Sequence, residues 1–195
     1  MRRTTAIRHL EELAESASTL LTGRARAALL SMWVGGELLD PVEELERGTV
    51  ILLLDVPAAE LPWLSVHPVE YGFNDDLRLG KRPILWYTRP SAWPAWTYRD
   101  RRVARFWTAA GGLDESAIEA LRERRLPPVV EPTDAELVAQ CRVELGVART
   151  HLRHVLDHYR DYPQPRGRSR EDREDELWRA AEAVLELGEV GEGTP

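Results

Sequence analysis

The sequence predicts an α+β fold: a mixed sheet of about four to five strands with flanking helices, followed by an antiparallel helical hairpin. Apolar residues recur at helical spacing near the N-terminus and again over the last third of the chain. Short apolar runs of strand length lie between these two regions, and the proline-rich stretch LPPVVEPTD separates them from the C-terminal part. We therefore expect a sheet domain over 1–127, a helical hairpin over 133–188 packed on it, and a flexible tail over 189–195.

The composition is that of a folded protein. With 195 residues, 43% hydrophobic and 30% charged, the chain can bury a substantial core. The longest apolar run, VILLLDV, has the length of a strand and not of a membrane span. The first residues favour an amphipathic helix over a secretory leader. One cysteine, Cys141, excludes an internal disulfide and a CxxC zinc site. We expect a cytoplasmic protein with no membrane partner.

The first helix is expected to begin at Thr4 or Thr5, either of which can cap it, and to stop at Gly23. Four short runs predict strands: 28–34, 49–56, 82–89 and 103–108. The second of these is apolar on both faces, as in the middle of a covered sheet. The stretch between the second and third predicts short helix and loop, and the fourth is expected to follow a hairpin-like return.

Cap and stop signals define the remaining helices. Gly111-Gly112 and Asp114 predict a helix to about Arg125, and prolines predict irregular structure over 126–134. Thr133 or Asp134 begins a long helix to about Tyr159, and the last helix is expected over Asp172–Leu187 with Gly188 as its terminator. The predicted apolar face of the last helix comprises Leu177, Trp178, Ala181, Val184 and Leu185.

Charge is unevenly distributed. The net charge is −7, but seven basic residues and one acid lie between Lys81 and Trp107, so this segment carries +6 and the remainder −13. An acidic protein is a poor general binder of nucleic acid, which leaves nucleic acid a less favoured partner. A local basic patch can still hold one anionic ligand or partner.

Aromatic residues and arginines alternate within this basic segment. Rings stack on bases and arginines pair with phosphates, as suits a nucleotide or a single-stranded segment. Alternatively, the rings fill the space between sheet and helices, and the arginines line an outer strand as a solvated edge. Pro94 favours a loop with at least one exposed tryptophan. We predict a binding surface that comprises Trp93, Trp96, Arg99, Arg101, Arg102, Arg105, Gly35 and Gly36.

The segment WVGGELLDPVEELERGTVILLLDV resembles the nucleotidyltransferase fold, in which a strand ends in Gly-Gly or Gly-Ser and an acid-x-acid pair opens a later strand. In that family the glycines approach a triphosphate and the acids hold two magnesium ions. Gly35-Gly36 fit this pattern. Glu44-x-Glu46 comes too early, Asp55 lies at the far end of its strand, and no third carboxylate follows. The resemblance implies the fold over about the first 125 residues, with a degenerate site. Alternatively, the glycines form a tight turn before a solvated acidic loop.

The stretch HLRHVLDH places three histidines along one edge of the long helix. His154 and His158, four residues apart, have the spacing at which two imidazoles can bind one zinc ion, with Glu144 or His151 as further candidates. No HExxH or His-Cys pattern completes such a site. We favour half-exposed imidazoles that hydrogen-bond to neighbours and water, and predict no cofactor.

Arg153 and His158 have an Arg-x4-His spacing similar to that of HEPN ribonuclease domains, helical bundles that often dimerise to bring the two together. The resemblance implies His158 as the acid or base and Arg153 as the phosphate-binding residue. On one helix the two side chains point about 140° apart, so they converge only at a helix end or across a dimer. The chain as a whole resembles an uncharacterised family of short conserved actinobacterial proteins that begin with a similar RRTTAIRHLEEL helix, which implies no particular activity.

We therefore predict a non-catalytic binding or regulatory protein whose partner is another protein or an anionic small molecule. A homodimer through the C-terminal helices is a further candidate. The alternatives are an RNA-cleaving or toxin–antitoxin component that uses Arg153 and His158, and a metal-dependent enzyme that uses the histidine edge.

Overall fold

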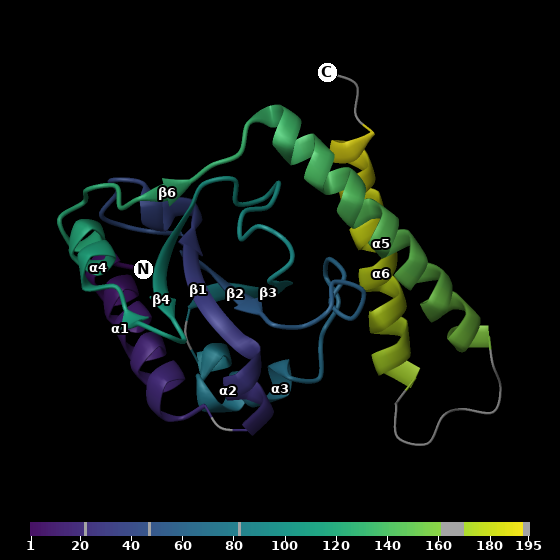
Figure 1. Ribbon diagram of the computed structural model, residues 1–195, viewed down its shortest axis with the longest axis horizontal. Coiled ribbons are helices and arrows are strands. Elements are labelled where there is room, and N and C mark those ends of the chain that lie inside the picture. The colour runs from purple at the N-terminus through teal and green to yellow at the C-terminus, as the bar shows by residue number, and fades with distance from the viewer. Residues whose placement is uncertain (22, 47, 82, 161–169, 193–195) are drawn as a thin grey trace. The chain divides into compact units, whose positions relative to one another are not determined.

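The computed structural model describes residues 1–21, 23–46, 48–81, 83–160 and 170–192. Contacts divide the chain into two compact units. The sheet unit comprises Met1–Pro57 and His67–Pro132, and the helical unit comprises Ala58–Val66 and Thr133–Pro195. The chain therefore leaves the sheet unit, contributes one short segment to the helical unit, and returns (Figure 1).

A mixed sheet of six described strands forms the centre of the sheet unit and confirms the α+β class. The strands are β1 (Leu29–Gly35), β2 (Gly48–Leu54), β3 (Ile84–Pro90), β4 (Val103–Thr108), β5 (Gly112–Leu113) and β6 (Val129–Val130). Their order is β3-β2-β1-β4-β5, with β6 also paired to β4. β2 and β3 are parallel and the other pairs are antiparallel. Every residue of β2 is buried, because the strand has a neighbour on each side and apolar residues on both faces.

Two predictions about the sheet, and one alternative, are wrong. β4 pairs with β1 and not with β3, so the chain between β3 and β4 is a crossing loop and not a hairpin return. The alternative in which the arginines line an outer strand does not hold for Arg105, because its strand β4 pairs with β1, β5 and β6. The proline-rich stretch contains β6, since two residues between prolines suffice to pair with Val103 and Ala104.

The helices of the sheet unit are α1 (Arg3–Thr19), α2 (Gly23–Ala28), α3 (Glu70–Asp76) and α4 (Glu115–Arg122), with 3-10 turns at Gly36–Leu39 and Leu79–Lys81. α1 packs on the sheet, where the Trp107 ring nitrogen donates to the Ser18 hydroxyl at 3.0 Å. Asp114 caps α4 as predicted, since its carboxylate accepts the Ala117 N–H at 3.1 Å.

A buried arginine joins three parts of the sheet unit. Arg3, in the first turn of α1, is 3% exposed. Its guanidinium donates to the carbonyls of Leu38, Asp40 and Leu121, at 2.9, 2.6 and 2.9 Å. These bonds satisfy both the buried cation and the carbonyls of the turn after β1 and the end of α4.

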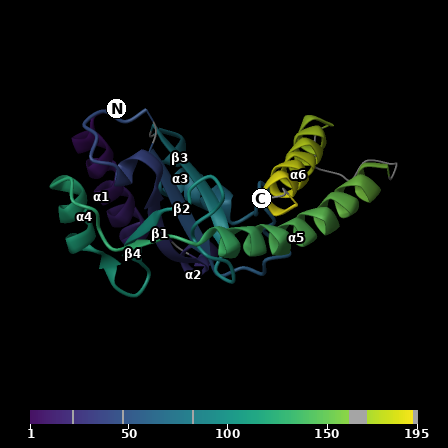
Figure 2. The same cartoon turned by 90° about the horizontal axis from the view of Figure 1, so that it is seen from above.

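The helical unit contains the predicted hairpin. α5 (Asp134–Arg160) and α6 (Arg170–Gly191) run antiparallel and lie side by side (Figures 1 and 2). Thr133 and Glu136 form a capping box, in which each backbone N–H donates to the other side chain. The segment Ala58–Val66 packs on this hairpin: Trp63 is 5% exposed, and its ring nitrogen donates to the Glu186 carboxylate at 3.0 Å. None of the helices in the described ranges is long and apolar enough to cross a membrane.

Three predicted helix ends are wrong. The N-cap of α1 is Arg2, with no side-chain cap, so Thr4 and Thr5 lie inside the helix. Gly23 begins α2, where it has φ +54°. α6 continues through Gly188 to residue 191, because packing on α5 outweighs the modest helical cost of one glycine. Residues 189–191 of the predicted tail at 189–195 therefore belong to α6, and residues 193–195 lie outside the described part of the chain.

Candidate binding surface

The loop between β3 and β4, residues 91–102, covers one face of the sheet. Trp33, Ile51 and Tyr87 are paired across β1, β2 and β3 and therefore share a face. The buried cluster on that face consists of Ile51, Leu53, Ala95 and Val103, against which Trp33, Tyr87 and Trp96 pack. The middle of the loop thus belongs to the core of the sheet unit.

Arg89 and Trp93 hold this loop on the sheet. Arg89, on β3, is 1% exposed, and its Nε donates to the Pro94 carbonyl at 2.7 Å. Its guanidinium lies over the Trp93 ring, 5.6 Å from the centroid. Trp93, predicted to be part of the binding surface, is only 7% exposed because its ring packs against Arg89. Trp96 is half-buried and keeps one part of its ring accessible.

The only acid of the basic segment points inward. Tyr87 donates its hydroxyl to the Asp100 carboxylate at 3.0 Å, and the Thr49 side chain is also bonded to Asp100. The Thr97 hydroxyl oxygen accepts the Asp100 N–H at 3.0 Å. Burial raises the pKa of the Asp100 carboxyl and of the Tyr87 phenol. We call Thr49, Tyr87, Thr97 and Asp100 the Asp100 cluster.

Gly35 and Gly36 make room for this carboxylate. A Cβ on Gly35 would lie 2.9 Å from the Asp100 Oδ1 and 3.1 Å from its Cβ. Gly36 has φ +63°, and a Cβ there would lie 3.3 Å from the same oxygen. The glycine pair therefore accommodates a side chain of its own chain. The sequence gives no local signal for this contact, because Asp100 is distant from the glycines along the chain.

The carboxylates that the nucleotidyltransferase resemblance requires do not gather at the glycine pair. The Glu37 carboxylate accepts the Glu46 N–H at 2.7 Å. Glu44 is exposed, and Asp55 is exposed beyond the opposite end of β2. Within the described ranges, no group of three or more His, Cys, Asp and Glu side chains could hold a metal ion.

The arginines of the predicted surface differ in their contacts. Arg102 forms an ion pair with Asp40, and Arg101 donates to the Pro132 carbonyl at 3.4 Å. Both are half-buried, whereas Arg99 and Arg105 are exposed.

Arg99 and Arg105 each lie on an aromatic ring. The Arg105 guanidinium lies 5.8 Å from the Trp33 centroid. The Arg99 guanidinium lies 5.8 Å from the Tyr98 centroid, and its Nε donates to the Tyr98 hydroxyl at 3.0 Å. We define the aromatic–arginine surface as Trp33, Trp96, Tyr98, Arg99 and Arg105.

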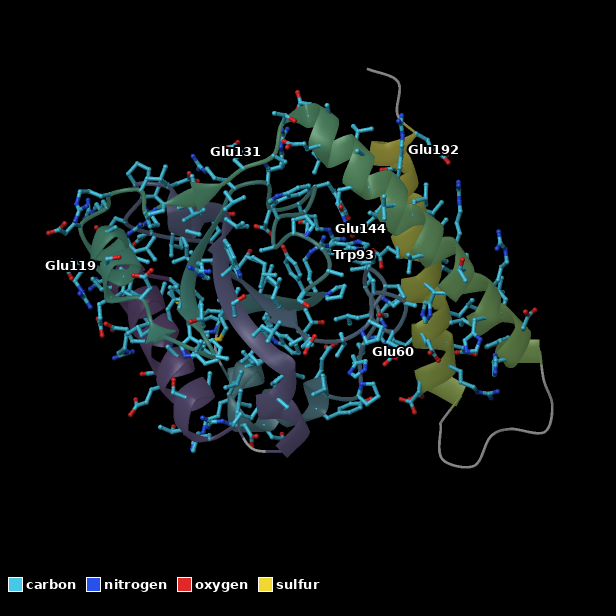
Figure 3. All side chains as sticks on the ribbon, viewed as in Figure 1. Glu60, Trp93, Glu119, Glu131, Glu144 and Glu192 are labelled. Carbon is cyan, nitrogen blue, oxygen red and sulfur yellow. The ribbon has the colours of Figure 1, made fainter. Side chains whose placement is uncertain are left out.

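The candidate metal ligands on the histidine edge of α5 do not form a complete site in the described part of the chain. They are Glu144, His151, His154 and His158. Glu144, labelled on α5 in Figure 3, is 3% exposed and accepts the Gln140 side-chain amide at 3.0 Å. His154 and His158 are exposed with ring centroids 4.0 Å apart, and the His158 Nδ1 is bonded to the His154 carbonyl at 2.8 Å. His151 is half-buried, and desolvation lowers its pKa. α5 is continuous through residues 153–158, so Arg153 and His158 point about 140° apart and form no joint site within one chain.

Sequence reasoning missed a groove of about 520 Å³ at the end of β2. Buried Glu70 lies near it, accepting from the Thr88 hydroxyl at 2.9 Å and the His67 N–H at 2.8 Å. Ligands of open α/β sheets commonly bind beyond the carboxyl ends of parallel strands, and β2 and β3 are the parallel pair here. The sequence did contain one signal for this groove, because the acid Asp55 directly follows β2. The lining consists of Ala25, Ala27, Ala28, Asp55, Val56, His67, Pro68, Val69 and Gly72.

A family model described as Domain of unknown function (DUF7711) matches residues 1–192. No curated protein and no solved structure matches the chain. These comparisons leave the function undetermined.

Proposed function

We propose that this chain, which belongs to the family Domain of unknown function (DUF7711), is a non-catalytic protein that binds an anionic ligand with a ring system, such as a nucleotide, at the aromatic–arginine surface. The observation that carries the proposal is the position of the exposed Arg105 guanidinium over the Trp33 ring. A guanidinium on an aromatic face keeps its N–H groups at its edge, where they can pair with an oxyanion.

Arg99 supplies a second cation, which the backbone holds in place. Its own N–H donates to the Thr97 hydroxyl oxygen at 3.1 Å, and its Nε bonds to Tyr98. Such ordering before binding lowers the entropy lost when a ligand is held. The Asp100 carboxylate is turned into the Asp100 cluster and offsets part of the Arg99 charge, whereas the Arg99 side chain itself is exposed.

A degenerate nucleotidyltransferase-like fold is compatible with a nucleotide ligand. The glycine pair lies against Asp100, and the acids that would hold magnesium are apart, which favours recognition over nucleotidyl transfer. A protein partner with an acidic segment is the alternative occupant of the same surface.

Two enzymatic alternatives have less support. RNA cleavage of the HEPN type needs Arg153 and His158 to converge, and α5 separates them within one chain. Metal-dependent catalysis on the histidine edge needs Glu144 or another acid beside His154 and His158, and Glu144 is buried and bonded to Gln140.

Tryptophan fluorescence titrated with nucleoside mono-, di- and triphosphates tests the proposal, with isothermal titration calorimetry as a second measurement. Trp33 and Trp96 belong to the surface, so their emission should change on binding. An Arg99→Ala/Arg105→Ala variant is expected to bind at least about 10-fold more weakly, since hydrogen bonds to charged groups contribute about 1.5–3 kcal/mol each. Arg8→Ala is the matched control, because this α1 side chain is 64% exposed and lies outside the surface.

The outcomes are distinct. Nucleotide binding that the double variant retains at full affinity contradicts the assigned surface. If the wild-type protein binds none of the nucleotides, the proposal is wrong.

A further inference from the structure

Among the described residues of the helical unit, the two large apolar side chains with the highest exposed fractions lie on α6. The side of α6 that faces α5 is filled by Ala180, Ala183 and Leu187, which are 3%, 1% and 1% exposed. Trp178 and Leu185 lie on a different side and are 75% and 68% exposed. Tryptophan is enriched at the centres of protein interfaces, and two such large side chains on one helix indicate an interaction surface.

These residues border one side of the hairpin. On this side the Arg142 Nε donates to the Gly191 carbonyl at 2.7 Å, near the end of α6 where Figure 3 labels Glu192. At about 100° per residue, Arg142, Arg149 and Arg153 form a ridge on this side of α5. All three are exposed. We call them the arginine ridge.

α6 presents a different ridge on the same side. Leu177, Ala181 and Val184 are half-buried and follow the line of Gly191, with Trp178 and Leu185 along the outer margin. We call these five apolar residues the apolar ridge. Next to its margin runs a line of exposed acids at helical spacing: Glu171, Asp175, Glu182 and Glu189.

We propose that a second copy of this chain covers this side of the hairpin, so that two hairpins form a four-helix homodimer. A rotation of 180° about an axis parallel to the helices places the arginine ridge of each copy over the apolar ridge of the other, beside its line of acids. Every contact then occurs twice, as in any two-fold interface. A two-fold axis perpendicular to the helices would set arginine against arginine, which like-charge repulsion disfavours.

The register within the hairpin identifies a specific contact. The Arg173 guanidinium lies 5.9 Å from the Tyr159 centroid, which fixes the antiparallel alignment of α5 with α6. Arg153, less than two turns before Tyr159, is therefore level with the turns of α6 that carry Trp178 and Glu182. In the dimer Arg153 lies on Trp178 of the second copy and pairs with its Glu182. Long arginine side chains can cover apolar surface while their charge reaches an acid at its rim.

The size of the surface fits a dimer. The 22 residues of α6 span about 33 Å, and two helices about 9 Å apart present a face about 20 Å wide. The resulting area of roughly 650 Å² per copy approaches the ~800 Å² per partner of a standard interface. This proposal concerns the helical unit and goes beyond ligand binding at the aromatic–arginine surface, so either can fail without the other.

Sedimentation velocity of the full chain between about 1 and 100 µM tests the dimer. Trp178→Arg and Leu185→Arg are each expected to raise the dissociation constant at least 50-fold, because they place a new cation against the arginine ridge of the second copy. Both positions are exposed, so circular dichroism should show an unchanged fold. Tyr71→Arg is the matched control: this α3 side chain is 73% exposed, and the variant is expected to dimerise like the wild type.

Charge reversal separates a second copy from a foreign partner. Arg153→Glu and Glu182→Arg are each expected to weaken self-association at least 10-fold, since each sets like charges together. A mixture of the two variants is expected to restore dimers, because both contacts of the mixed pair then join opposite charges. A wild-type chain that stays monomeric over the whole range overturns the proposal, and so does self-association that Trp178→Arg leaves unchanged.

Discussion

The contact between Gly35 and Asp100 makes a quantitative prediction about Gly35→Ala. The added Cβ would meet three atoms of the Asp100 side chain, Oδ1, Cβ and Cγ, at 2.9, 3.1 and 3.2 Å. Asp100 cannot move away without loss, because its carboxylate is bonded to Tyr87 and Thr49. We expect Gly35→Ala to lower the free energy of unfolding by about 1–3 kcal/mol, as overpacking of a buried site usually does.

A double-mutant cycle with Asp100→Gly isolates the cause. Asp100→Gly removes all three atoms that the new Cβ would meet. Its own backbone entropy cost enters both arms of the cycle and cancels. Urea denaturation of the four proteins should show that Gly35→Ala costs less than about 0.5 kcal/mol when Asp100 is glycine. If Gly35→Ala lowers the free energy of unfolding equally with Asp100 and with glycine at position 100, the glycine pair does not make room for the Asp100 side chain. If Gly35→Ala leaves the stability unchanged but abolishes nucleotide binding, Gly35 instead lies close to the ligand, as the glycines of nucleotidyltransferases do.

Two further predictions concern α5. Gly146→Ala should stabilise the protein by about 0.5–1 kcal/mol, because a Cβ there meets nothing within 4 Å and glycine is a poor helix residue. Urea denaturation measures this change, and a loss of stability would show that Gly146 has another role. Desolvation lowers the pKa of His151 from 6.5, partly opposed by Glu176, so the unfolded chain takes up the proton first. His151 therefore contributes stability above about pH 6.5 that is lost as the pH falls through its folded pKa. Between about pH 7.5 and 5, the denaturation midpoint of His151→Asn should fall less steeply than that of the wild type. Equal slopes for the two proteins would contradict a lowered pKa of His151 in the folded state.

The parts of the fold that the sequence predicts correctly depend on local interactions. Thr133 with Glu136 and Asp114 with Ala117 are contacts between residues three apart, so caps and helical spacing suffice to predict the beginnings of α5 and α4. The buried run of β2 likewise identifies an interior strand from its own residues.

The parts that the sequence does not predict depend on distant residues. The loop before β4 looks like a hairpin return, but the bond from Arg89 to the Pro94 carbonyl folds it over the sheet, and β4 pairs with β1. Helical spacing shows that Trp178 and Leu185 share a side of α6, yet it does not show which side faces α5. That choice follows from Ala180 and Ala183, whose small side chains allow close helix packing.

The sequence predicts only part of the candidate site. Composition identifies a basic, aromatic segment, and Arg99 and Arg105 are indeed exposed. The inward position of Asp100 and the burial of Trp93 follow from tertiary hydrogen bonds and packing, for which the sequence carries no periodic signal.

The path of the chain between β2 and β3 constrains how this protein can be divided. Residues 58–66 leave the sheet unit to place Leu61 and Trp63, 2% and 5% exposed, in the helical unit. A fragment that stops at Pro132 retains these two apolar side chains without the helices of their own unit, and a fragment that starts at Thr133 lacks them. No single scission yields two intact halves, so recombination could exchange either unit only by splicing the chain at several points.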